Sequence, residues 1–422
     1  MTAPHLTILT CAPLPAPTAI SWPRSYLTHP LRVLYVEGNI DGTIGGSFYS
    51  LLFLVKGLDK SRYVPIVVFS TANELIAKFE AAGARVIIRP LARPVRLTWS
   101  GGRWFARAAN FWLGWIGEPL RLARLLRRER VALVHLNNSI LRNHPWMVAA
   151  RLCRLPCVTH ERGINPRYTL TARSLGRGLA AVICISTAVR DNFAAVGVRA
   201  LRLVTIPNGL DPNEMAVTKS PAAILGQEFA LASATSVVGI VGNIRRWKGQ
   251  HVVIRAMGLL QATVPGAVCL IIGPYSEDDR DYRDEIVRLI AELKLEGRVI
   301  VTGYRPNVAD YVNAVQVLVH ASVSPEPFGR VLLEGMALAK PIAASRGGAV
   351  PEIVDDGVTG LLFTPGNSVE LAQALSTLLR DADLRATLGR AGYQRLVRQF
   401  GIDTNVAKTQ ELYANILTGV PA

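Results

Sequence analysis

Two glutamates bracket a predicted turn in the C-terminal half of the chain. Seven residues separate Glu326 from Glu334, and Gly329 lies between them, directly before an apolar helical pattern. A glycine at this point lets a ligand's oxygens meet the first free N–H groups of the helix, an arrangement that attracts phosphate. Because Glu334 lies in an otherwise apolar run, we expect a partner to hydrogen-bond its carboxylate. Spacing alone also fits a solvated loop acid followed by a helix-surface acid.

The residues around these glutamates resemble a known signature. Their spacing is similar to the E-x7-E motif of retaining glycosyltransferases of the GT-B fold, glycosyltransferase family 4, also called group 1. The neighbouring residues that match this family's pattern are Pro327, Phe328, Gly329, Leu333, Ala337, Pro341, Gly347, Gly348, Pro351, Glu352, Gly357 and Gly360. The resemblance implies an enzyme that moves a sugar from a nucleoside diphosphate sugar to an acceptor, with retention of the anomeric configuration.

Length and composition limit the class of protein. A chain of 422 residues is too long for one ordinary core, so we expect two domains. It has no run of 18 uncharged apolar residues, which predicts a protein that is soluble or peripheral at a membrane. The first 30 residues are broken by prolines and lack a charged n-region, which favours a flexible tail over a secretory signal. Five cysteines without a completed zinc pattern indicate reduced thiols in a cytoplasmic protein.

Positive charge is confined to the N-terminal half. Residues 1–215 contain 27 Lys and Arg against 11 Asp and Glu, whereas residues 216–422 contain 20 of each, so the first half carries the whole net charge of +16. This asymmetry favours an acidic partner for that half. An anionic membrane, a phosphate-bearing acceptor and nucleic acid would each supply one.

The N-terminal half begins with a strand, a glycine turn and a helix. Leu31–Glu37 has the pattern of a short buried strand, and Gly45 and Gly46 precede an apolar helix expected over residues 48–58. Such a unit opens a nucleotide-binding half-domain, although a tight turn explains a glycine pair equally well. The family resemblance implies that the two glycines lie against the donor diphosphate and the acceptor.

A histidine follows the strand expected from residue 157 onward. His160 stands where polar groups mark the carboxyl end of that strand, and ligands bind parallel sheets at this end. By residue type alone, a lone histidine is more often structural or solvated. The resemblance implies that His160 lies close to the transferred sugar. Glu161 and Arg162 beside it are candidates for setting its charge or for binding an acidic acceptor, and whether His160 acts chemically or only binds stays open.

Residues 104–130 depart from the alternation of strands and helices. Aromatic residues in the first part are followed by arginines in the second: Trp104, Phe105, Phe111, Trp112, Trp115, Arg121, Arg124, Arg127, Arg128 and Arg130. This composition fits the interface of an anionic bilayer. A pair of core-packed helices with a solvated basic face fits it equally well.

The C-terminal half restarts the pattern with a basic turn. A strand expected over residues 236–241 is followed by Asn243, Arg245, Lys248 and Gly249. A glycine turn with cations at a helix start can neutralise a diphosphate, and an exposed basic turn would have the same composition. The resembled family usually has an arginine directly after the first glycine. Here Asn243 takes that place, so the role passes to Arg245, while Lys248 matches the family's lysine.

The resemblance assigns roles on the donor side. Glu334 would hold the ribose hydroxyls and Glu326 the sugar hydroxyls. The other implied donor-site residues are Gly45, Gly46, Asn243, Arg245, Lys248, Tyr304, Arg305, Phe328, Gly329, Arg330 and Val331. Because cations and N–H groups would stabilise the leaving diphosphate, we expect neither a metal nor another cofactor. The D-x-D run from Asp279 to Asp281 lies beside a predicted surface helix and is interpreted as solvated charge.

The strand and helix pattern restarts once along the chain. It predicts an α/β fold of two doubly wound Rossmann-like domains facing a cleft, which the resemblance specifies as GT-B. The expected units are a flexible tail over residues 1–30, an acceptor-binding domain over 31–215, a nucleotide-sugar donor-binding domain over 216–400, and a C-terminal helix over 401–422 that packs back toward the first domain. Residues 212–227 are the expected linker.

The sequence therefore favours a retaining, metal-independent glycosyltransferase. The basic first half indicates a lipid-linked or otherwise anionic glycan acceptor, in polysaccharide or glycolipid assembly at the inner face of the cell membrane. No carboxylate is evident for covalent double displacement, so we expect same-face attack in which the leaving phosphate assists deprotonation of the acceptor. The alternatives are an epimerase or phosphorylase on a similar fold, and a non-enzymatic binder of membrane or nucleic acid. The binder gives no reason for the turn between Glu326 and Glu334, so we expect no nucleic-acid partner.

Overall fold

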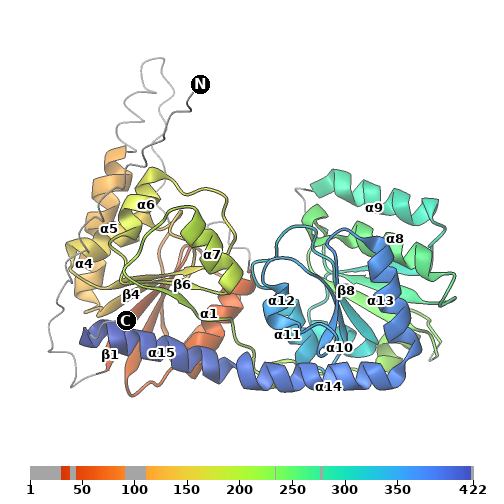
Figure 1. Ribbon diagram of the computed structural model, residues 1–422. Helices are drawn as coiled ribbons and strands as arrows, with labels where there is room; N and C mark the ends of the chain where they lie inside the picture. Colours follow the sequence, from red (N-terminus) through yellow and green to blue (C-terminus); the bar gives the residue numbers. More distant parts are fainter. Residues whose placement is uncertain (1–29, 39–43, 91–110, 233, 276–278, 420–422) are drawn as a thin grey trace, which may run out of the picture.

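Two parallel β-sheets with helices packed against them make up the fold (Figure 1). The structure is a computed structural model, and it describes residues 30–38, 44–90, 111–232, 234–275 and 279–419. Residues 1–29 of the predicted tail lie outside the described residues.

The first sheet has seven strands in the order β3-β2-β1-β4-β5-β6-β7, and all neighbours pair in parallel. The strands are β1 (Leu31–Glu37), β2 (Tyr63–Phe69), β3 (Arg85–Ile88), β4 (Leu133–Leu136), β5 (Cys157–Glu161), β6 (Ala181–Cys184) and β7 (Leu203–Thr205). The order reverses between β1 and β4, and open α/β sheets bind ligands beyond the carboxyl ends of the strands at such a reversal.

The second sheet repeats this plan with six parallel strands in the order β10-β9-β8-β11-β12-β13. The strands are β8 (Val237–Val241), β9 (Val268–Ile272), β10 (Val299–Gly303), β11 (Val317–His320), β12 (Ile342–Ser345) and β13 (Gly360–Phe363). Here the order reverses between β8 and β11. The predicted α/β fold of two doubly wound parallel sheets is confirmed.

Helices follow most strands. Those of the first unit are α1 (Gly46–Gly57), α2 (Ile76–Ala81), α4 (Glu118–Arg128), α5 (His144–Leu152), α6 (Leu170–Gly176) and α7 (Thr187–Ala195). Those of the second unit are α8 (Gln250–Leu260), α9 (Arg280–Glu292), α10 (Val308–Ala314), α11 (Arg330–Ala337), α12 (Val350–Ile353) and α13 (Ser368–Arg380). The chain then continues into α14 (Ala382–Gln399) and α15 (Ile402–Thr418).

Strand β1 is buried on both faces, which explains its uninterrupted apolar sequence. Leu34 and Val36 point to one face and pack in the cluster that includes Leu122 of α4. Val33 and Tyr35 point to the other face and pack in the cluster that includes α1 and α15. Period-2 alternation therefore distributes one strand between two cores.

The last two helices connect the two units. Figure 1 shows α14 below the second sheet and α15 below the first, with the C-terminus beneath the first sheet. At the junction, Leu210 N donates to Phe400 O at 3.0 Å and Asn405 Nδ2 donates to Pro207 O at 2.6 Å. A Cβ at Gly209 would lie 2.7 Å from Ile402 Cα, so the turn after β7 requires glycine where α15 begins.

The expected linker over residues 212–227 is more ordered than a plain loop. It contains a 3₁₀ turn (Pro212–Glu214) and most of a π-helical turn (Ala223–Glu228). The reason is burial: Ile224 and Leu225 pack in a cluster on the second sheet.

The basic and aromatic segment is only partly described, because residues 91–110 lie outside the described residues. After it comes a π-helical turn (Leu113–Gly117) that leads into α4. Leu122, Ala123 and Leu126 of α4 are buried, whereas Arg121 and Arg124 are exposed. No helix in the described part of the chain is both long and apolar enough to cross a membrane.

Candidate functional site

The carboxylate of Glu326 is the centre of a buried cluster at the carboxyl edge of the second sheet. Its Oε2 atom accepts hydrogen bonds from Lys248 Nζ at 2.8 Å, Ser322 Oγ at 2.9 Å and His320 Nε2 at 3.0 Å. Burial alone would raise the pKa of Glu326, but the hydrogen bond from His320 and the charge of Lys248 outweigh it and lower this pKa to about 2. The carboxylate is therefore ionised although only 6% of the residue is exposed.

Two glycines allow the segments of this cluster to approach one another. Gly249, with φ of +74°, follows the 3₁₀ turn Arg246–Lys248, and a Cβ there would lie 1.9 Å from the carbonyl oxygen of Ala321. Gly348, with φ of +60°, has the same role against Glu326, since a Cβ there would lie 2.2 Å from Glu326 O. Both positions combine a left-handed backbone with contact to another backbone, which only glycine satisfies.

The N-terminus of α11 lies three residues after Glu326. Gly329 is its N-cap with φ of +88°, and the amides of Arg330 and Val331 open the helix, where no earlier turn supplies acceptors. Arg330 Nη2 lies 3.7 Å from Glu334 Oε1, so the carboxylate has an ion-pair partner at a distance longer than the hydrogen bond expected from the sequence. Arg330 Nη1 also donates to Gly46 O at 3.0 Å, so one arginine links the first unit to the second.

Three residues of the predicted donor site influence the pKa of Tyr49 on α1. Burial raises the pKa of Tyr49 most, and smaller electrostatic contributions come from Tyr304, Arg330 and Glu334. Tyr304 is 70% exposed and is free to meet a ligand. Tyr304, Arg330 and Glu334 therefore lie near enough to Tyr49 to influence its pKa.

Three other predicted donor-site residues have different surroundings. The guanidinium of Arg305 is 3.4 Å from Glu228 and 5.0 Å from the Tyr311 ring centroid, so it holds the π-helical turn 223–228. Phe328 is 4% exposed and packs edge-on against Phe400 in the core. Asn243 is exposed, and its carbonyl accepts from Gln250 Nε2. Arg305 and Phe328 thus support the site through packing rather than through an open side chain.

In the first unit, His160 ends up inside the protein. It is 2% exposed, and its Nδ1 atom lies 3.1 Å from His135 Nε2 and 3.4 Å from Arg162 Nη2. Arg162 is itself fixed by Asn137 Oδ1 at 2.6 Å and Asn208 Oδ1 at 2.9 Å. Burial, with the charge of Arg162 and the neighbouring histidine, lowers the pKa of His160 well below its usual value, so the ring is neutral.

The predicted acceptor contact of Glu161 does not agree with its placement. Glu161 has no exposed surface, and its carboxylate accepts from Ile140 N at 2.9 Å and from the Tyr168 hydroxyl at 2.9 Å. It therefore stabilises the segment after β4 instead of meeting an acceptor directly. The strand is buried on both faces, so no alternation in the sequence marked this side chain as internal.

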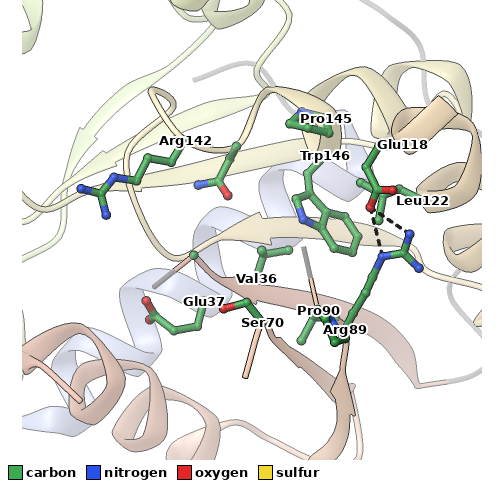
Figure 2. A pocket seen from close by; sticks show the side chains of 13 residues that line it. Val36, Glu37, Ser70, Arg89, Pro90, Glu118, Leu122, Arg142, Pro145 and Trp146 are labelled. Atoms are coloured by element: carbon green, nitrogen blue, oxygen red, sulfur yellow. Dashed lines mark hydrogen bonds and ion pairs between the residues drawn. The ribbon is translucent and has the colours of Figure 1, made fainter. Parts of the chain in front are cut away.

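A cavity of about 80 Å³ beside β1 and β2 was not predicted from the sequence. Figure 2 shows Trp146 in its wall, with the Arg89–Glu118 ion pair on one side and Glu37 and Arg142 on the other. An indole face beside charged groups suits a ligand that is apolar on one side and polar on the other. Position at the carboxyl edge of β1 and β2 was the only signal in the sequence that could have located it.

The two units are in direct contact beside the site. Ser186 Oγ donates to Pro327 O at 2.7 Å, immediately after Glu326. The carboxylate of Glu352 accepts from the amides of Thr187 and Ala188 at 2.7 and 2.8 Å, so a residue of the second unit caps α7 of the first. These contacts fix the turn at Glu326 relative to the first sheet.

Comparisons with known proteins agree with this architecture. A model described as Glycosyltransferase Family 4 matches residues 44–214, and one described as Glycosyl transferases group 1 matches residues 226–395. The GDP-mannose-dependent alpha-(1-6)-phosphatidylinositol monomannoside mannosyltransferase of Mycobacterium tuberculosis is 30% identical over 312 residues, which cover 70% of this chain and 73% of that protein.

The chain belongs to glycosyltransferase family 4, group 1.

A similar solved structure identifies the fold of this family 4 member. The Anabaena protein Alr3699/HepE, solved in complex with UDP-glucose, has a TM-score of 0.76 and 25% sequence identity, covering 91% of this chain and 100% of that one. The fold is GT-B. The N-acetyl-alpha-D-glucosaminyl L-malate synthase of Bacillus anthracis is 27% identical over 213 residues, and the matched part spans 54% of that protein, about half its length.

Residue types that bind metals are scattered among the described residues of this family 4 member. Within the described ranges, no three His, Cys, Asp or Glu side chains converge as metal ligands do. Asp279 and Asp281 of the D-x-D run lie at the start of the surface helix α9, as interpreted from the sequence. The described cysteines are free thiols, as expected: Cys153, Cys157, Cys184 and Cys269.

Proposed function

We propose that the protein is a retaining, metal-independent glycosyltransferase that moves a sugar from a nucleoside diphosphate sugar to an acceptor. The observation that carries the proposal is the buried, ionised carboxylate of Glu326, held 2.8 Å from Lys248 beside the N-terminus of α11. A fixed carboxylate accepts from sugar hydroxyls, and an ammonium group with free amides neutralises phosphate. Breaking a sugar–phosphate bond needs both kinds of group in one site.

The donor is proposed to lie between the turn and α1. Oε2 of Glu326 already accepts three hydrogen bonds, so Oε1 is the oxygen available to sugar hydroxyls. Glu334, whose carboxylate lies 3.7 Å from Arg330 Nη2, would accept from the ribose hydroxyls. Tyr304, the exposed aromatic side chain nearby, would pack against the nucleobase.

The proposed chemistry is same-face attack. The bond between the anomeric carbon and the diphosphate oxygen breaks, and Lys248, Arg245 and the first amides of α11 stabilise the negative charge on the leaving group. The acceptor hydroxyl forms the new bond on the same face, and its proton passes to an oxygen of the leaving phosphate. Glu326 is held as a hydrogen-bond acceptor by three donors and is not assigned as a nucleophile.

The acceptor is proposed to be a lipid-linked or otherwise anionic glycan bound by the first unit. The cavity beside Trp146 offers an aromatic wall and arginine side chains for such a molecule. On the outside of this unit, Phe111 and Trp112 are 59% and 61% exposed, and Arg121, Arg124, Arg127 and Arg128 of α4, further along the same helical segment, are exposed as well. We propose that this surface holds the enzyme at an anionic membrane from the cytoplasmic side.

Calorimetric binding of UDP, GDP and ADP, each with and without EDTA, tests the donor site. Tight binding of one nucleotide that is insensitive to EDTA, and that Glu334→Ala weakens at least tenfold, supports the proposal. Glu296→Ala is the matched control, because Glu296 is an exposed acid on the same unit, in the turn between α9 and β10. If none of the three nucleotides binds, the assignment of the second unit is wrong.

Sedimentation with lipid vesicles tests the membrane proposal. We expect binding to phosphatidylglycerol vesicles but not to phosphatidylcholine vesicles, weakening steadily as sodium chloride is added. The double reversal Arg124→Glu and Arg128→Glu should abolish it, whereas Arg288→Glu with Lys294→Glu, which reverses two exposed charges on the second unit, should not. Binding that persists at high salt would contradict the electrostatic part of the proposal.

A further inference from the structure

A chain of four buried side chains connects His160 to the C-terminal helix. His160 Nδ1 lies 3.1 Å from His135 Nε2 on β4. The other ring nitrogen of His135, Nδ1, is hydrogen-bonded to the hydroxyl of Tyr413 on α15, and that hydroxyl lies 3.3 Å from the Tyr35 hydroxyl. None of the four residues is more than 2% exposed.

The direction of these hydrogen bonds is decided by Arg162. A guanidinium only donates, so its approach to His160 Nδ1 at 3.4 Å makes that nitrogen an acceptor. His135 must then donate from Nε2, which leaves its own Nδ1 as an acceptor for the hydroxyl of Tyr413. Because a hydroxyl has one proton, the Tyr413 oxygen in turn accepts from the Tyr35 hydroxyl, 3.3 Å away. A neutral His160 that accepts at Nδ1 carries its single proton on Nε2.

Both histidines are neutral, which makes this tautomer a defined property. Burial lowers the pKa of His135 to about 3, and burial together with the charge of Arg162 lowers the pKa of His160 as well. Burial also keeps the hydroxyl of Tyr413 protonated, because it raises the pKa of this group. Each of the two rings and the hydroxyl of Tyr413 therefore carries one proton, and the hydrogen bonds determine which ring nitrogen holds it.

The chain of hydrogen bonds stops at the Nε2 atom of His160. It is buried and has no hydrogen-bond partner among the described residues. A buried N–H without an acceptor is costly, so such a group in a native protein calls for an explanation, and a bound ligand is one. His160 is at the carboxyl end of β5, the edge at which Arg162 and Asn137 also lie.

We propose that His135 and Tyr413 are positioning residues that hold His160 in the Nε2–H tautomer, so that His160 donates a hydrogen bond to an oxygen of the bound glycosyl donor or acceptor and does not act as a base. The identification of that oxygen as part of a glycosyl donor or acceptor rests on the proposed function. The tautomer itself is a property of the protein without substrate. The C-terminal helix thereby takes part in the site through a residue 278 positions from its partner His135.

Nitrogen-15 NMR of histidine side chains tests the tautomer in the substrate-free protein. We expect the His160 signals, identified by their loss in His160→Gln, to show a protonated Nε2 and an unprotonated Nδ1. In Tyr413→Phe, His135 loses the donor to its Nδ1, so we expect the His160 signals to shift toward a mixture of tautomers. A protonated Nδ1 in the wild type would overturn the proposal, whatever reaction the protein catalyses.

Tyr63→Phe is the matched control for Tyr413→Phe. Tyr63 also donates its hydroxyl to α15, to Gln410 O at 3.3 Å, and its ring packs on Tyr413, but it has no hydrogen bond to either histidine. Both variants remove one hydroxyl at the same helix contact. Equal changes in the His160 signals of the two variants would show that only the docking of α15 matters, and would also overturn the proposal.

Kinetics separate donation from proton abstraction once a transfer assay is established. We expect Tyr413→Phe to lower kcat/KM about tenfold and Tyr63→Phe to leave it within twofold of wild type. His160→Gln, whose amide still donates, should keep at least ten times the activity of His160→Ala. Equal loss in the Gln and Ala variants would identify His160 as a base and contradict the proposal, whereas binding of a nucleotide by all variants shows that the donor site itself is intact.

Discussion

The buried carboxylates of the two domains are stabilised in opposite ways. In the second domain, an ammonium group lies 2.8 Å from Glu326 and the carboxylate is ionised. In the first domain, the amide groups of Asn137 and Asn138 donate to Glu37, and a backbone amide and a tyrosine hydroxyl donate to Glu161. Burial raises the pKa of both Glu37 and Glu161. The neutral donors reduce the rise at both carboxyls, and the more distant charge of Arg162 reduces it further at Glu37.

The difference separates two tasks within one glycosyltransferase. A leaving diphosphate develops charge, and fixed ions placed before the reaction stabilise it without reorganisation. In the proposed function, Lys248 is such an ion in the second domain, and the carboxylate of Glu326 holds its ammonium group in place at 2.8 Å. In the first domain, the network around Glu37 and His160 fixes orientations instead, because each buried group, the Arg162 guanidinium included, is held by directional hydrogen bonds.

Removing the ammonium group from the second domain should have the largest effect. In Lys248→Met, Glu326 stays buried while its cation is lost, so we expect transfer to fall at least about a hundredfold and the free energy of unfolding to fall by about 3 kcal/mol. Initial rates of transfer and urea unfolding measure the two effects.

Lys340→Met is the control for that substitution. Burial lowers the pKa of Lys340 to about 8, and its Nζ atom donates to Asn313 O, with no carboxylate of the described residues paired to it. We expect transfer by this variant to match wild type. Equal loss of transfer in both variants would show that Lys248 acts through general stability and not through charge at the site.

A substitution at Gly249, where two backbone segments approach closely, should have the next largest effect, a loss of stability. Gly249→Ala would place Cβ 1.9 Å from the carbonyl of Ala321 on a backbone with φ of +74°, so we expect about 4 kcal/mol of lost stability. Gly266→Ala has a similar φ of +92° but open space around it, and should cost only about 1 kcal/mol. If thermal unfolding shows similar losses, the left-handed backbone and not the contact makes glycine necessary.

The sequence was most informative where a pattern is local. The bounds expected for β1 and the start expected for β5 agree with the structure, because both are short apolar runs that end at polar residues. Gly329 before α11 could also be predicted, since a glycine between a strand end and an apolar helix is a local signal. Within the turn, the roles of Glu326 and Glu334 came from the family resemblance and stay predictions.

Contacts between distant segments could not be predicted in this way. The partner of His135 is 278 residues away on a helix whose path depends on how the chain crosses between the domains. The cap that Glu352 provides for α7 joins two domains that no periodic pattern relates. Glu161 lies in a strand covered on both faces, where alternation carries no signal of inside and outside.

The opposite pKa shifts predict opposite pH dependences of stability. The pKa of Glu326 is about 2 in the folded protein against 4.5 when unfolded, so its contribution, about 3 kcal/mol, is present above pH 5 and lost as the pH falls toward 2. The folded pKa of Glu37 is raised, so its contribution is present at low pH and lost as the pH rises through 4.5 and above. Urea unfolding between pH 2 and 7 should show that Glu326→Gln flattens the first slope and Glu37→Gln the second. Slopes of the same sign would contradict the contrast between the domains.

A substitution of Arg330, which contacts both domains, should have the smallest effect. Its guanidinium donates to Gly46 O and lies 3.7 Å from Glu334, but it is partly exposed, so Arg330→Gln should cost less than about 1 kcal/mol of stability. Glu334 then loses its neighbouring charge, and we expect nucleotide affinity to fall about fivefold by calorimetry. Arg346→Gln, which removes an exposed ion pair with Asp356 in the same domain, should leave the affinity unchanged. Loss of affinity in Arg346→Gln but not in Arg330→Gln would separate the first domain from donor binding and remove the reason for treating Gly46 as part of the donor site.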